Sequence, residues 1–303
     1  MKLNKVLRAQ VRQTLFRLIL TLLVLLIQSC AGKPWTSPVA DSETGLITQT
    51  FEEMQERDAS CFSCLDAKTM LSWDTPGEDR SIVGFLQLML PASVKFVILN
   101  PLGQPLYALV NNGQDFQSIN TSLKQHIIGK IGSLATQNKI PKSLLSENWG
   151  YWLTGRLHEQ GATIEAIHQD GSGRGVWITM RYQDEASLNK SHLLIQPATR
   201  QLLTRILVDR DGETIATISY DRRNEQNNCA PGSRINISDL PYGSQLSIDF
   251  TEILTDRSFS AANFRGRRVL GLWHVLILFW PFPDLPCENR PNQDCQGYSH
   301  CLV

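Results

Sequence analysis

Cysteine and histidine carry the most specific chemistry in this chain, so their spacing is the first guide to function. The six histidines include no His-Glu-x-x-His motif and no other pair at the helical spacing of metal ligands. There is no Gly-x-Ser-x-Gly motif, and the glycine-rich Gly171–Gly175 lies between two predicted strands, not ahead of a helix. We therefore expect no catalytic residue, no bound metal and no cofactor, and a protein that is not an enzyme.

Cys61-Phe-Ser-Cys64 has the spacing of redox pairs and of half zinc sites. A zinc site needs a second such pair at a suitable distance, and none is present. A redox pair of the thioredoxin type lies at a helix N-terminus after a strand, whereas this pair follows a predicted helix and precedes a predicted strand. These observations favour structural disulfides over either chemistry.

The N-terminus indicates export. Residues 1–17 are polar and basic, and residues 18–27 are apolar except for one hydroxyl, a run shorter than the about 20 residues that cross a bilayer as a helix. This arrangement is typical of a secretory signal. Gln28-Ser-Cys30-Ala31 then resembles the lipobox of bacterial lipoproteins, which implies cleavage before Cys30 and lipid modification of its sulfur. In the enterobacterial sorting rule, an Asp directly after the lipidated cysteine retains a lipoprotein in the inner membrane. Ala31 occupies this position here, so the resemblance implies an outer-membrane anchor facing the periplasm. An ordinary secretory signal is the alternative.

Six cysteines remain once Cys30 is assigned to the membrane anchor. An even number in an exported chain predicts disulfides, whose pairing the sequence leaves open. The disulfide candidates are Cys61, Cys64, Cys229, Cys287, Cys295 and Cys301.

The charge balance argues against a nucleic-acid partner. The chain has 29 Lys+Arg and 29 Asp+Glu, but residues 1–29 hold five of the cations and no acid. The remainder carries 24 cations against 29 anions, a net charge of −5. A nucleic-acid binder needs a basic face, so we expect no nucleic acid among its partners.

Most of the chain shows the apolar–polar alternation of antiparallel strands, divided by turn signals such as Asn112-Gly113, Asp170-Gly171 and Asp211-Gly212. No parallel crossover is evident, because strand follows strand through short turns. The predicted strands are Leu65–Trp73, Ser81–Leu90, Val94–Leu99, Leu106–Val110, Phe116–Ile119, Thr163–Gln169, Gly175–Tyr182, His192–Gln196, Arg200–Asp209, Glu213–Asp221, Arg234–Ile237 and Gln245–Ile253.

Three segments have helical periodicity instead: residues 46–57, 121–137 and 142–153. An antiparallel sheet of about ten strands must curl or close on itself. We therefore expect a mainly β protein with a helical insertion, in which a curled antiparallel sheet forms an incomplete, half-open β-barrel capped by helices.

Two segments carry a resemblance to a known family. In the first, a strand ends at Pro101-Leu-Gly-Gln104 and the next leads to Asn112-Gly113; in the second, Pro141 precedes a helix that ends in Trp152-Leu-Thr-Gly-Arg156. Over about residues 46–255 this order resembles the lipoprotein-localization family of LolA and LolB. The resemblance implies a half-barrel that holds acyl chains on its concave, apolar side.

The residues expected to line such a cavity are the apolar positions predicted to face inward, and core packing is the alternative for each of them. They are Leu71, Trp73, Phe85, Leu88, Phe96, Ile98, Leu109, Ile127, Ile131, Leu134, Trp149, Trp152, Trp177 and Ile206. Met89 and Leu90, at a hairpin tip, are candidates for membrane contact, as the family's protruding loop implies; a buried hairpin is the alternative.

The last 40 or so residues differ from the rest. Val269–Phe282 is strongly apolar and too short to span a bilayer as a helix. We favour a further buried strand of the same shell, with a segment contacting a membrane or a partner as the alternative. Residues 284–303 have little periodicity and contain three cysteines.

The expected organisation is a signal peptide at 1–29, a lipidated tether at 30–45, a half-barrel domain at 46–260, and an apolar segment with a Cys-rich tail at 261–303. The function expected is that of a membrane-anchored carrier or acceptor, with acyl chains of a lipid or lipoprotein as partners. The alternative is a non-catalytic structural or interaction lipoprotein, braced by disulfides, that binds another envelope protein.

Overall fold

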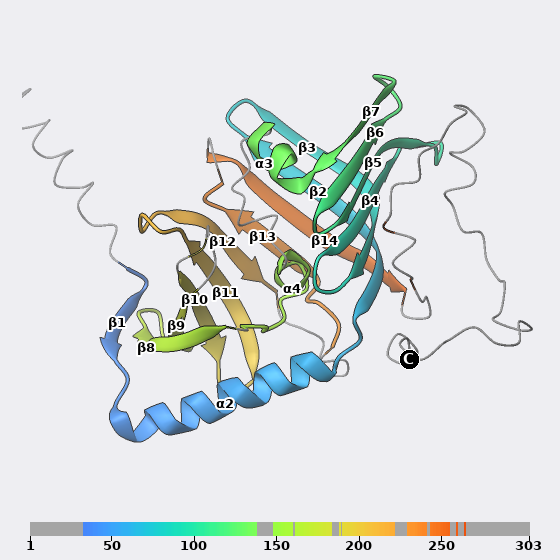
Figure 1. Cartoon of the computed structure of the whole chain (residues 1–303). Helices are drawn as coiled ribbons and strands as arrows, with labels where there is room; N and C mark the ends of the chain where they lie inside the picture. The colour runs from blue at the N-terminus through green and yellow to red at the C-terminus, as the bar shows by residue number, and fades with distance from the viewer. Residues whose placement is uncertain are drawn as a thin grey trace, which may run out of the picture.

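The architecture is one large antiparallel sheet that curls around two helices (Figure 1). The computed structural model describes residues 33–137, 148–159, 161–183, 188, 190–221, 229–240, 243–254, 259 and 264. Its elements are β1 (Trp35–Pro38), α2 (Asp41–Ser60), β2 (Cys64–Thr75), β3 (Glu78–Met89), β4 (Ser93–Leu99), β5 (Pro105–Asn112), β6 (Asp115–Asn120), β7 (Gln125–Lys130), α3 (Ile131–Gln137), α4 (Trp149–Trp152), β8 (Ala162–Asp170), β9 (Val176–Tyr182), β10 (Lys190–Gln196), β11 (Gln201–Val208), β12 (Thr214–Tyr220), β13 (Arg234–Ser238) and β14 (Gln245–Leu254).

Two meanders of neighbouring strands make up the sheet. Strands β2 to β7 form one half and β8 to β14 the other, and β14 pairs with β2 to join them. The described order begins at β1, which pairs with β8, and ends at β7, so these are the two edges and the sheet is not closed. The prediction of a curled, half-open antiparallel sheet is thereby confirmed.

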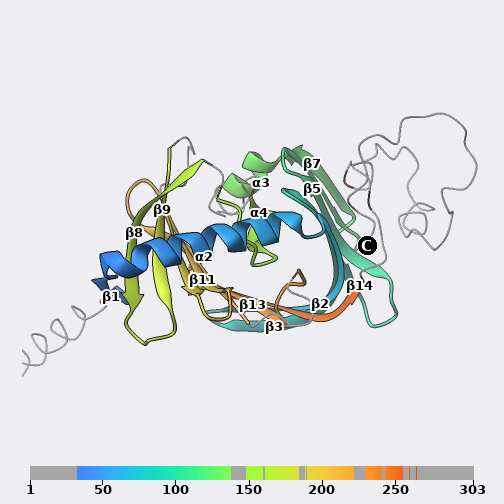
Figure 2. The same cartoon turned by 90° about the horizontal axis from the view of Figure 1, so that it is seen from below.

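The register assigns each strand residue to one of two faces, because directly paired residues lie on the same side of a sheet. We call the face that packs against α2 and α4 the inner face. On β8 to β11 it carries Ile167, Ile178 and Leu193, which form a core with Ile47, Phe51 and Met54 of α2. Figure 2 shows α2 running across one end of the curl, with α4 further inside it.

The predicted helix at 46–57 is confirmed but begins earlier, at Asp41, and ends at Ser60. Asp41 and Glu43 lie in its first turn and Arg57 in its last, which is the charge order that the helix dipole favours. The predicted strands are all present within the described residues. The sheet has fourteen strands, not about ten.

The helix predicted over residues 121–137 is wrong in its first part. Gln125–Lys130 is strand β7, paired with β6 from Asp115↔Lys130 to Asn120↔Gln125, and only Ile131–Gln137 is helical. A tight turn at Lys124, with φ of 53°, reverses the chain before β7. The spacing of Leu123, Ile127 and Ile131 suited a helix equally well, but backbone pairing with β6 decides the outcome. Residues 142–147 of the last predicted helix lie outside the described residues, and its end is α4.

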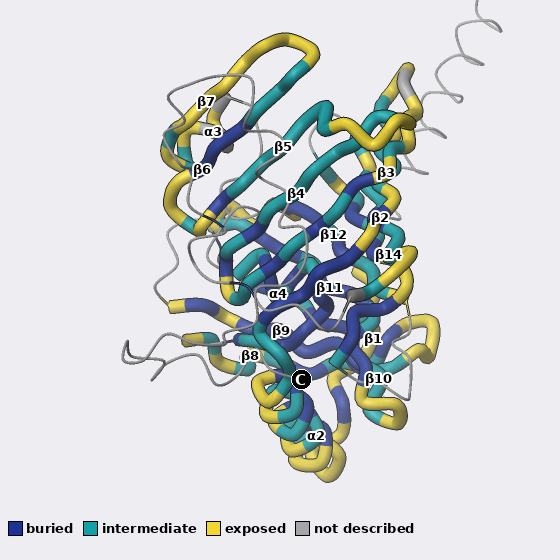
Figure 3. Tube along the Cα trace, turned by 90° about the vertical axis from the view of Figure 1, so that its right-hand side faces the viewer, coloured by how far each residue is buried: buried dark blue, intermediate teal, exposed yellow. Residues whose placement is uncertain are grey.

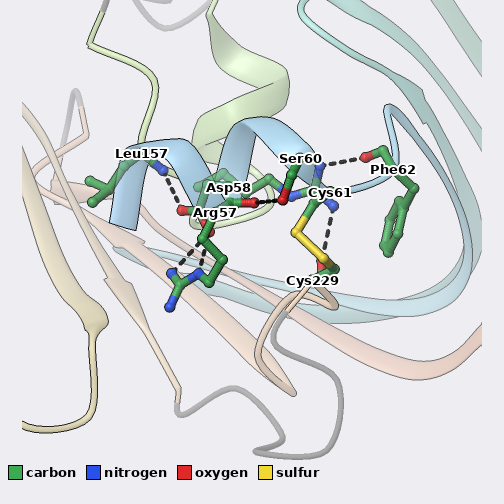
Figure 4. Close-up of a disulfide and its surroundings, with 8 residues drawn as sticks. Arg57, Asp58, Ser60, Cys61, Phe62, Leu157 and Cys229 are labelled. Carbon is green, nitrogen blue, oxygen red and sulfur yellow. Dashed lines mark hydrogen bonds and ion pairs between the residues drawn. A yellow bond between two sulfur atoms is a disulfide. The ribbon is translucent and has the colours of Figure 1, made fainter. Parts of the chain in front are cut away.

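One disulfide joins the end of α2 to the segment before β13. Cys61 and Cys229 are bonded across a sequence separation of 168, with their Cα atoms 5.3 Å apart (Figure 4). The preference for a structural disulfide is confirmed at Cys61. Cys64 is buried at the start of β2 beside Phe259 and Phe264. The candidates Cys287, Cys295 and Cys301, like Cys30, lie outside the described residues.

Burial is uneven across the sheet. Figure 3 shows long buried stretches in the β8–β12 half, whereas β4 and β5 are drawn mostly as half-buried and β7 mostly as exposed. Ile127 and Ile128 of β7 are 44% and 57% exposed. No described helix is long and apolar enough to cross a membrane.

A close backbone contact holds α4 against the β3–β4 hairpin and gives a stability prediction. A Cβ added at Gly150 would lie 2.4 Å from the carbonyl oxygen of Pro91, whereas one added at Gly132 of α3 would meet nothing within 4 Å. We expect Gly150→Ala to lower the free energy of unfolding by at least about 2 kcal/mol, because backbone must move to admit the methyl group. Gly132→Ala is the matched control, with a change of less than about 1 kcal/mol. Urea unfolding of both variants is the measurement, and equal stability would contradict the contact.

Candidate functional site

The short helix α4 is the centre of the inner face. Trp149 and Leu153, which caps it, contact apolar residues of both halves of the sheet, and Trp152 is buried against β11 to β14. The indole nitrogen of Trp149 donates a hydrogen bond of 2.7 Å to the carbonyl of Ala92, in the β3–β4 hairpin. One turn of helix therefore fixes the distance between the two halves.

A glycine ends α4 and turns the chain inward. Gly155 has φ of 65°, in the left-handed region, and its N–H donates to the carbonyl of Trp152. The next N–H, of Arg156, donates back to the carbonyl of Tyr151 over 3.0 Å. This is the Schellman arrangement, which requires a residue without Cβ strain at the turn. It explains in physical terms why the Trp152-x-x-Gly-Arg156 sequence contains glycine.

Arg156 lies buried on the inner side and binds two backbone carbonyls. Its guanidinium donates to the carbonyl of Phe62 over 2.5 Å and to that of Cys229 over 2.9 Å. The same group lies 4.5 Å from the centre of the Phe62 ring. Phe62 follows Cys61 in the sequence, and Cys229 is the other cysteine of the disulfide. The two acceptor carbonyls therefore belong to the two chain segments that the disulfide joins. Nearby, the carboxylate of Asp58 accepts the N–H of Leu157 over 2.8 Å and binds Arg57 (Figure 4).

A buried ion pair holds the segment that runs from Arg156 to Glu159. Arg205, on the inner face of β11, donates to the Glu159 carboxylate over 2.5 Å and to the carbonyl of Arg156 over 3.2 Å. The hydroxyl of Tyr182 donates to the other Glu159 oxygen. Both charged side chains are 1% exposed. Burial acts to lower the pKa of Arg205, but the Glu159 carboxylate outweighs it, so that the pKa lies above its ordinary value. The chemistry here is structural: it holds residues 156–159 against the sheet.

Beyond α4, the inner face of β4 to β7 carries apolar residues that stay partly open. Phe96 pairs with Leu109, Leu109 with Ser118, and Ser118 with Ile127, so these side chains form one row across four strands. Ile98 and Tyr107 form the adjacent row. All are half-buried except Ile127, which is exposed, and Ser118, which is buried and donates to the Tyr107 hydroxyl over 3.0 Å. We call Phe96, Ile98, Tyr107, Leu109 and Ile127 the inner patch.

The structure places most of the predicted lining residues on the inner side. By register these are Leu71, Trp73, Leu88, Phe96, Ile98, Leu109 and Ile127 in the sheet, with Trp149 and Trp152 in α4. Of these, Leu88 and Trp152 are fully buried in core clusters, so they pack the interior. Ile131 begins α3, and the side chain of Leu134 lies outside the described part of the chain.

Three predicted lining residues lie on the outer face instead: Phe85, Trp177 and Ile206. Phe85 and Leu88 are an odd number of residues apart in one regular strand, so only one of them can face inward. Ile206 lies on the outer face because its neighbour Arg205 points inward, where the Glu159 carboxylate binds its charge. Strand β9 is buried on both faces, so alternation could not decide the side of Trp177.

Trp177 packs under the N-terminal strand. Its indole nitrogen donates to Asp170 over 2.8 Å, and its ring lies 5.7 Å from that of Trp35 in β1. The Trp35 ring lies 4.5 Å from His192, which shares a 2.9 Å hydrogen bond with the Thr179 hydroxyl. Burial, together with the nearby charge of Lys190, lowers the pKa of His192 to about 4. This cluster attaches β1 to the outer face of the sheet.

The hairpin tip with Met89 and Leu90 packs against the protein on both sides. Met89 contacts the cluster of Cys64, Phe259 and Phe264, and both tip residues are half-buried. The N–H of Gly150 in α4 donates to the carbonyl of Pro91 over 3.0 Å. Contact of Met89 and Leu90 with a membrane stays a prediction. Within the described ranges, no group of three or more His, Cys, Asp or Glu side chains could hold a metal ion.

Sequence reasoning missed Arg205 and Glu159, and it quoted Arg156 only as part of a family pattern. A signal for Arg205 was present: it interrupts Gln201–Val208, a strand that is otherwise almost wholly apolar on the same face. A charge at such a position needs a buried counter-ion. Glu159, in a segment without periodicity, had no comparable signal.

No protein-family model and no curated protein sequence matches this chain. Its fold, however, is found in solved structures. A domain from Vibrio parahaemolyticus, described as an outer membrane lipoprotein-sorting protein domain, aligns over 72% of this chain and 96% of its own length, with 12% identity and a TM-score of 0.51. A DUF1329 family protein from Desulfovibrio piger aligns over 76% and 98%, with 11% identity and a TM-score of 0.51.

A LolA superfamily protein from Nitrosomonas europaea aligns over 72% of this chain and 97% of its own, with 14% identity and a TM-score of 0.48. At these identities the likeness concerns the fold. The chain thus has the fold of lipoprotein-sorting domains, and the resemblance inferred from the sequence is confirmed at that level.

The buried ion pair gives a prediction of non-additive stability. We expect Arg205→Met alone to lower the free energy of unfolding by about 3 to 5 kcal/mol, because Glu159 is left charged and buried. Adding Glu159→Leu restores most of this loss, since two apolar side chains need no solvation. A double-mutant cycle measured by urea unfolding tests the coupling, and additive losses would contradict it.

The His192 environment gives a prediction of pH dependence. The folded pKa of about 4 lies below the ordinary value of 6.5, so the unfolded chain takes up the proton first as the pH falls. We expect stability to be unaffected by this group above pH 6.5 and to decrease as the pH falls from 6.5 toward 4. Gln keeps a hydrogen bond to Thr179 but does not titrate. Stability curves for His192→Gln that fall as steeply as those of the unmodified protein would refute this assignment.

Proposed function

We propose that this protein is a lipid-anchored protein of the bacterial envelope that takes up acyl chains of a lipid or lipoprotein on its inner patch. It acts as a carrier or acceptor and performs no catalysis. The observation that carries the proposal is the row Phe96, Leu109 and Ile127, which stays half-buried or exposed on the inner face, whereas α2 and α4 pack against the buried core residues of the β8 to β14 half. The shared fold with a lipoprotein-sorting domain supports it.

The chemistry of the inner patch suits an alkyl chain. Its side chains are aliphatic or aromatic, and each Å² of apolar surface removed from water contributes about 25 cal/mol. The Ser118 hydroxyl donates to the Tyr107 hydroxyl between the two rows, and the row of Ile98 and Tyr107 continues into the polar Asn120 and Gln125 at its far end. A chain laid along the rows would displace water from surface that the fold leaves accessible. Binding of this kind is reversible, and its direction depends on relative affinities for donor, carrier and membrane.

The N-terminal features support a membrane tether close to the sheet. The proposed lipidated residue, Cys30, precedes β1 by five residues, and β1 is held to the outer face through Trp35. The described chain thus begins beside the β1 edge of the sheet, at the opposite end of the strand order from β7. We propose that the protein remains attached to the outer membrane on the periplasmic side while the patch takes up its ligand.

Ile127 and Ile128 provide a matched test of the inner patch. They are adjacent, chemically identical and both exposed, yet they lie on opposite faces of β7. In a soluble version that begins at residue 31, we expect Ile127→Asp to weaken binding of a dansyl-labelled fatty acid at least tenfold. Ile128→Asp is expected to change the Kd by less than twofold, since its side chain points away from the patch. Fluorescence titration gives both values.

The same titration separates the two functional classes. Saturable uptake of the labelled fatty acid and of a diacylated peptide, lost in Ile127→Asp alone, supports the carrier. If the unmodified protein takes up neither probe, the proposal fails, and a disulfide-braced scaffold that binds another envelope protein remains. Equal weakening by both substitutions would place the ligand elsewhere than the inner patch.

A further inference from the structure

The hydrogen bond between Ser118 and Tyr107 is a feature of the inner face that a purely hydrocarbon ligand would not need. Ser118 is 8% exposed, so its hydroxyl has little access to water and must find an acceptor within the protein. It donates to the Tyr107 hydroxyl over 3.0 Å. Ser118 belongs to the row of Phe96 and Leu109, and Tyr107 to the adjacent row, so the two hydroxyls lie within the apolar surface.

This bond fixes what the Tyr107 hydroxyl offers to a ligand. A phenol oxygen that accepts the Ser118 hydrogen still carries a hydrogen of its own. None of the described residues accepts that hydrogen, and the Tyr107 side chain is half-buried on the inner face. The pair therefore presents a hydrogen-bond donor to whatever covers the inner patch.

A ligand laid on the inner patch removes the water that otherwise accepts from Tyr107. If methylene groups alone replaced this water, the hydroxyl would be buried with its hydrogen unbonded, which opposes binding. A carbonyl oxygen at the same place restores the bond. A fatty acyl ester has such an oxygen where its chain meets the head group, whereas the corresponding alkyl ether has no carbonyl.

The residues beyond Tyr107 indicate the direction of the ligand. Tyr107 pairs with Asn120, and Asn120 pairs with the exposed Gln125 on the edge strand β7. We propose that Tyr107 determines the specificity of the inner patch by donating a hydrogen bond to the carbonyl of a fatty acyl ester of glycerol. The acyl chain then lies toward Phe96 and Ile98, and the head group toward Asn120 and Gln125. This inference rests on the binding proposed above and adds the chemical class of the ligand.

Matched ester and ether ligands test the donor directly. The full-length protein is kept in solution by an amphipathic polymer, so that no detergent micelle competes for the ligand. One arm compares dihexanoyl phosphatidylglycerol with its dihexyl ether, and the other compares a dihexanoylglyceryl-cysteine peptide with its ether form. Calorimetric titration gives the Kd of each. Tyr107→Phe removes one hydroxyl from the inner face, and the control Ser72→Ala removes one from the Ser72–Ser81 hydroxyl pair on the outer face.

We expect the unmodified protein to bind the ester at least about fivefold more tightly than the matching ether, because only the ester satisfies Tyr107. Tyr107→Phe is expected to remove this preference, and Ser72→Ala to retain it. The infrared band of a carbon-13-labelled ester carbonyl should move to lower wavenumber on binding to the unmodified protein but not on binding to Tyr107→Phe, a difference that a merely structural tyrosine would not produce. The lower of the two ester Kd values identifies the source, a phospholipid or a lipoprotein.

Equal Kd values for ester and ether in the unmodified protein would overturn the inference, whatever the variants do. A preference that survives in Tyr107→Phe would overturn it as well. If the dansyl-labelled fatty acid still binds in either case, the carrier function stands and the role of Tyr107 alone is refuted. If no ligand binds at all, both proposals fail together.

Discussion

The buried guanidinium of Arg156 is the constraint on which the rest of the structure depends. An arginine cannot lose its charge, so in the interior it must be surrounded by acceptors. Those acceptors are the carbonyls of Phe62 and Cys229, one on each side of the disulfide, while the carbonyl of Arg156 itself accepts from Arg205. The end of α2, the loop before β13 and the segment after α4 are thereby held to a single point. Removing the side chain would leave the carbonyls of two separate segments, at Phe62 and at Cys229, without their donor.

This fixed point divides the inner face into two parts with different roles. On the β8 side, α2 and α4 fill the curl with large apolar side chains, and a buried ion pair sets the position of residues 156–159. On the β4 to β7 side the same face keeps its apolar residues partly accessible. The ligand binding proposed above would take place at the open half without disturbing the packing of the filled half, because the two halves depend on different contacts.

The sequence predicted the strands inside the sheet well and its edges poorly. Internal strands such as β3 and β13 are paired on both sides and alternate between more and less buried residues, so their sequences carry a clear pattern. The two strands that were not foreseen, β1 and β7, are the two edges. Trp35–Pro38 was interpreted as tether, and Gln125–Lys130 as helix. The predicted face of the sheet was wrong for Trp177, whose strand is buried on both faces. It was also wrong for Ile206, because the charge of the neighbouring Arg205 is buried with a partner that is distant in sequence. Neither fact is contained in local alternation.

The pairing of β14 with β2 has a consequence for how the chain folds. Every other strand pair except β1–β8 joins neighbours in sequence and can form as a local hairpin, whereas β14 meets β2 across more than 170 residues. Contacts of such separation form slowly, since the loop between them must be closed first. The two meanders can assemble independently, but the curl that brings them together waits for a strand near the end of the chain. A chain still being synthesised therefore has an open, unjoined sheet, and its exposed edges must be kept apart from those of other chains until β14 is made.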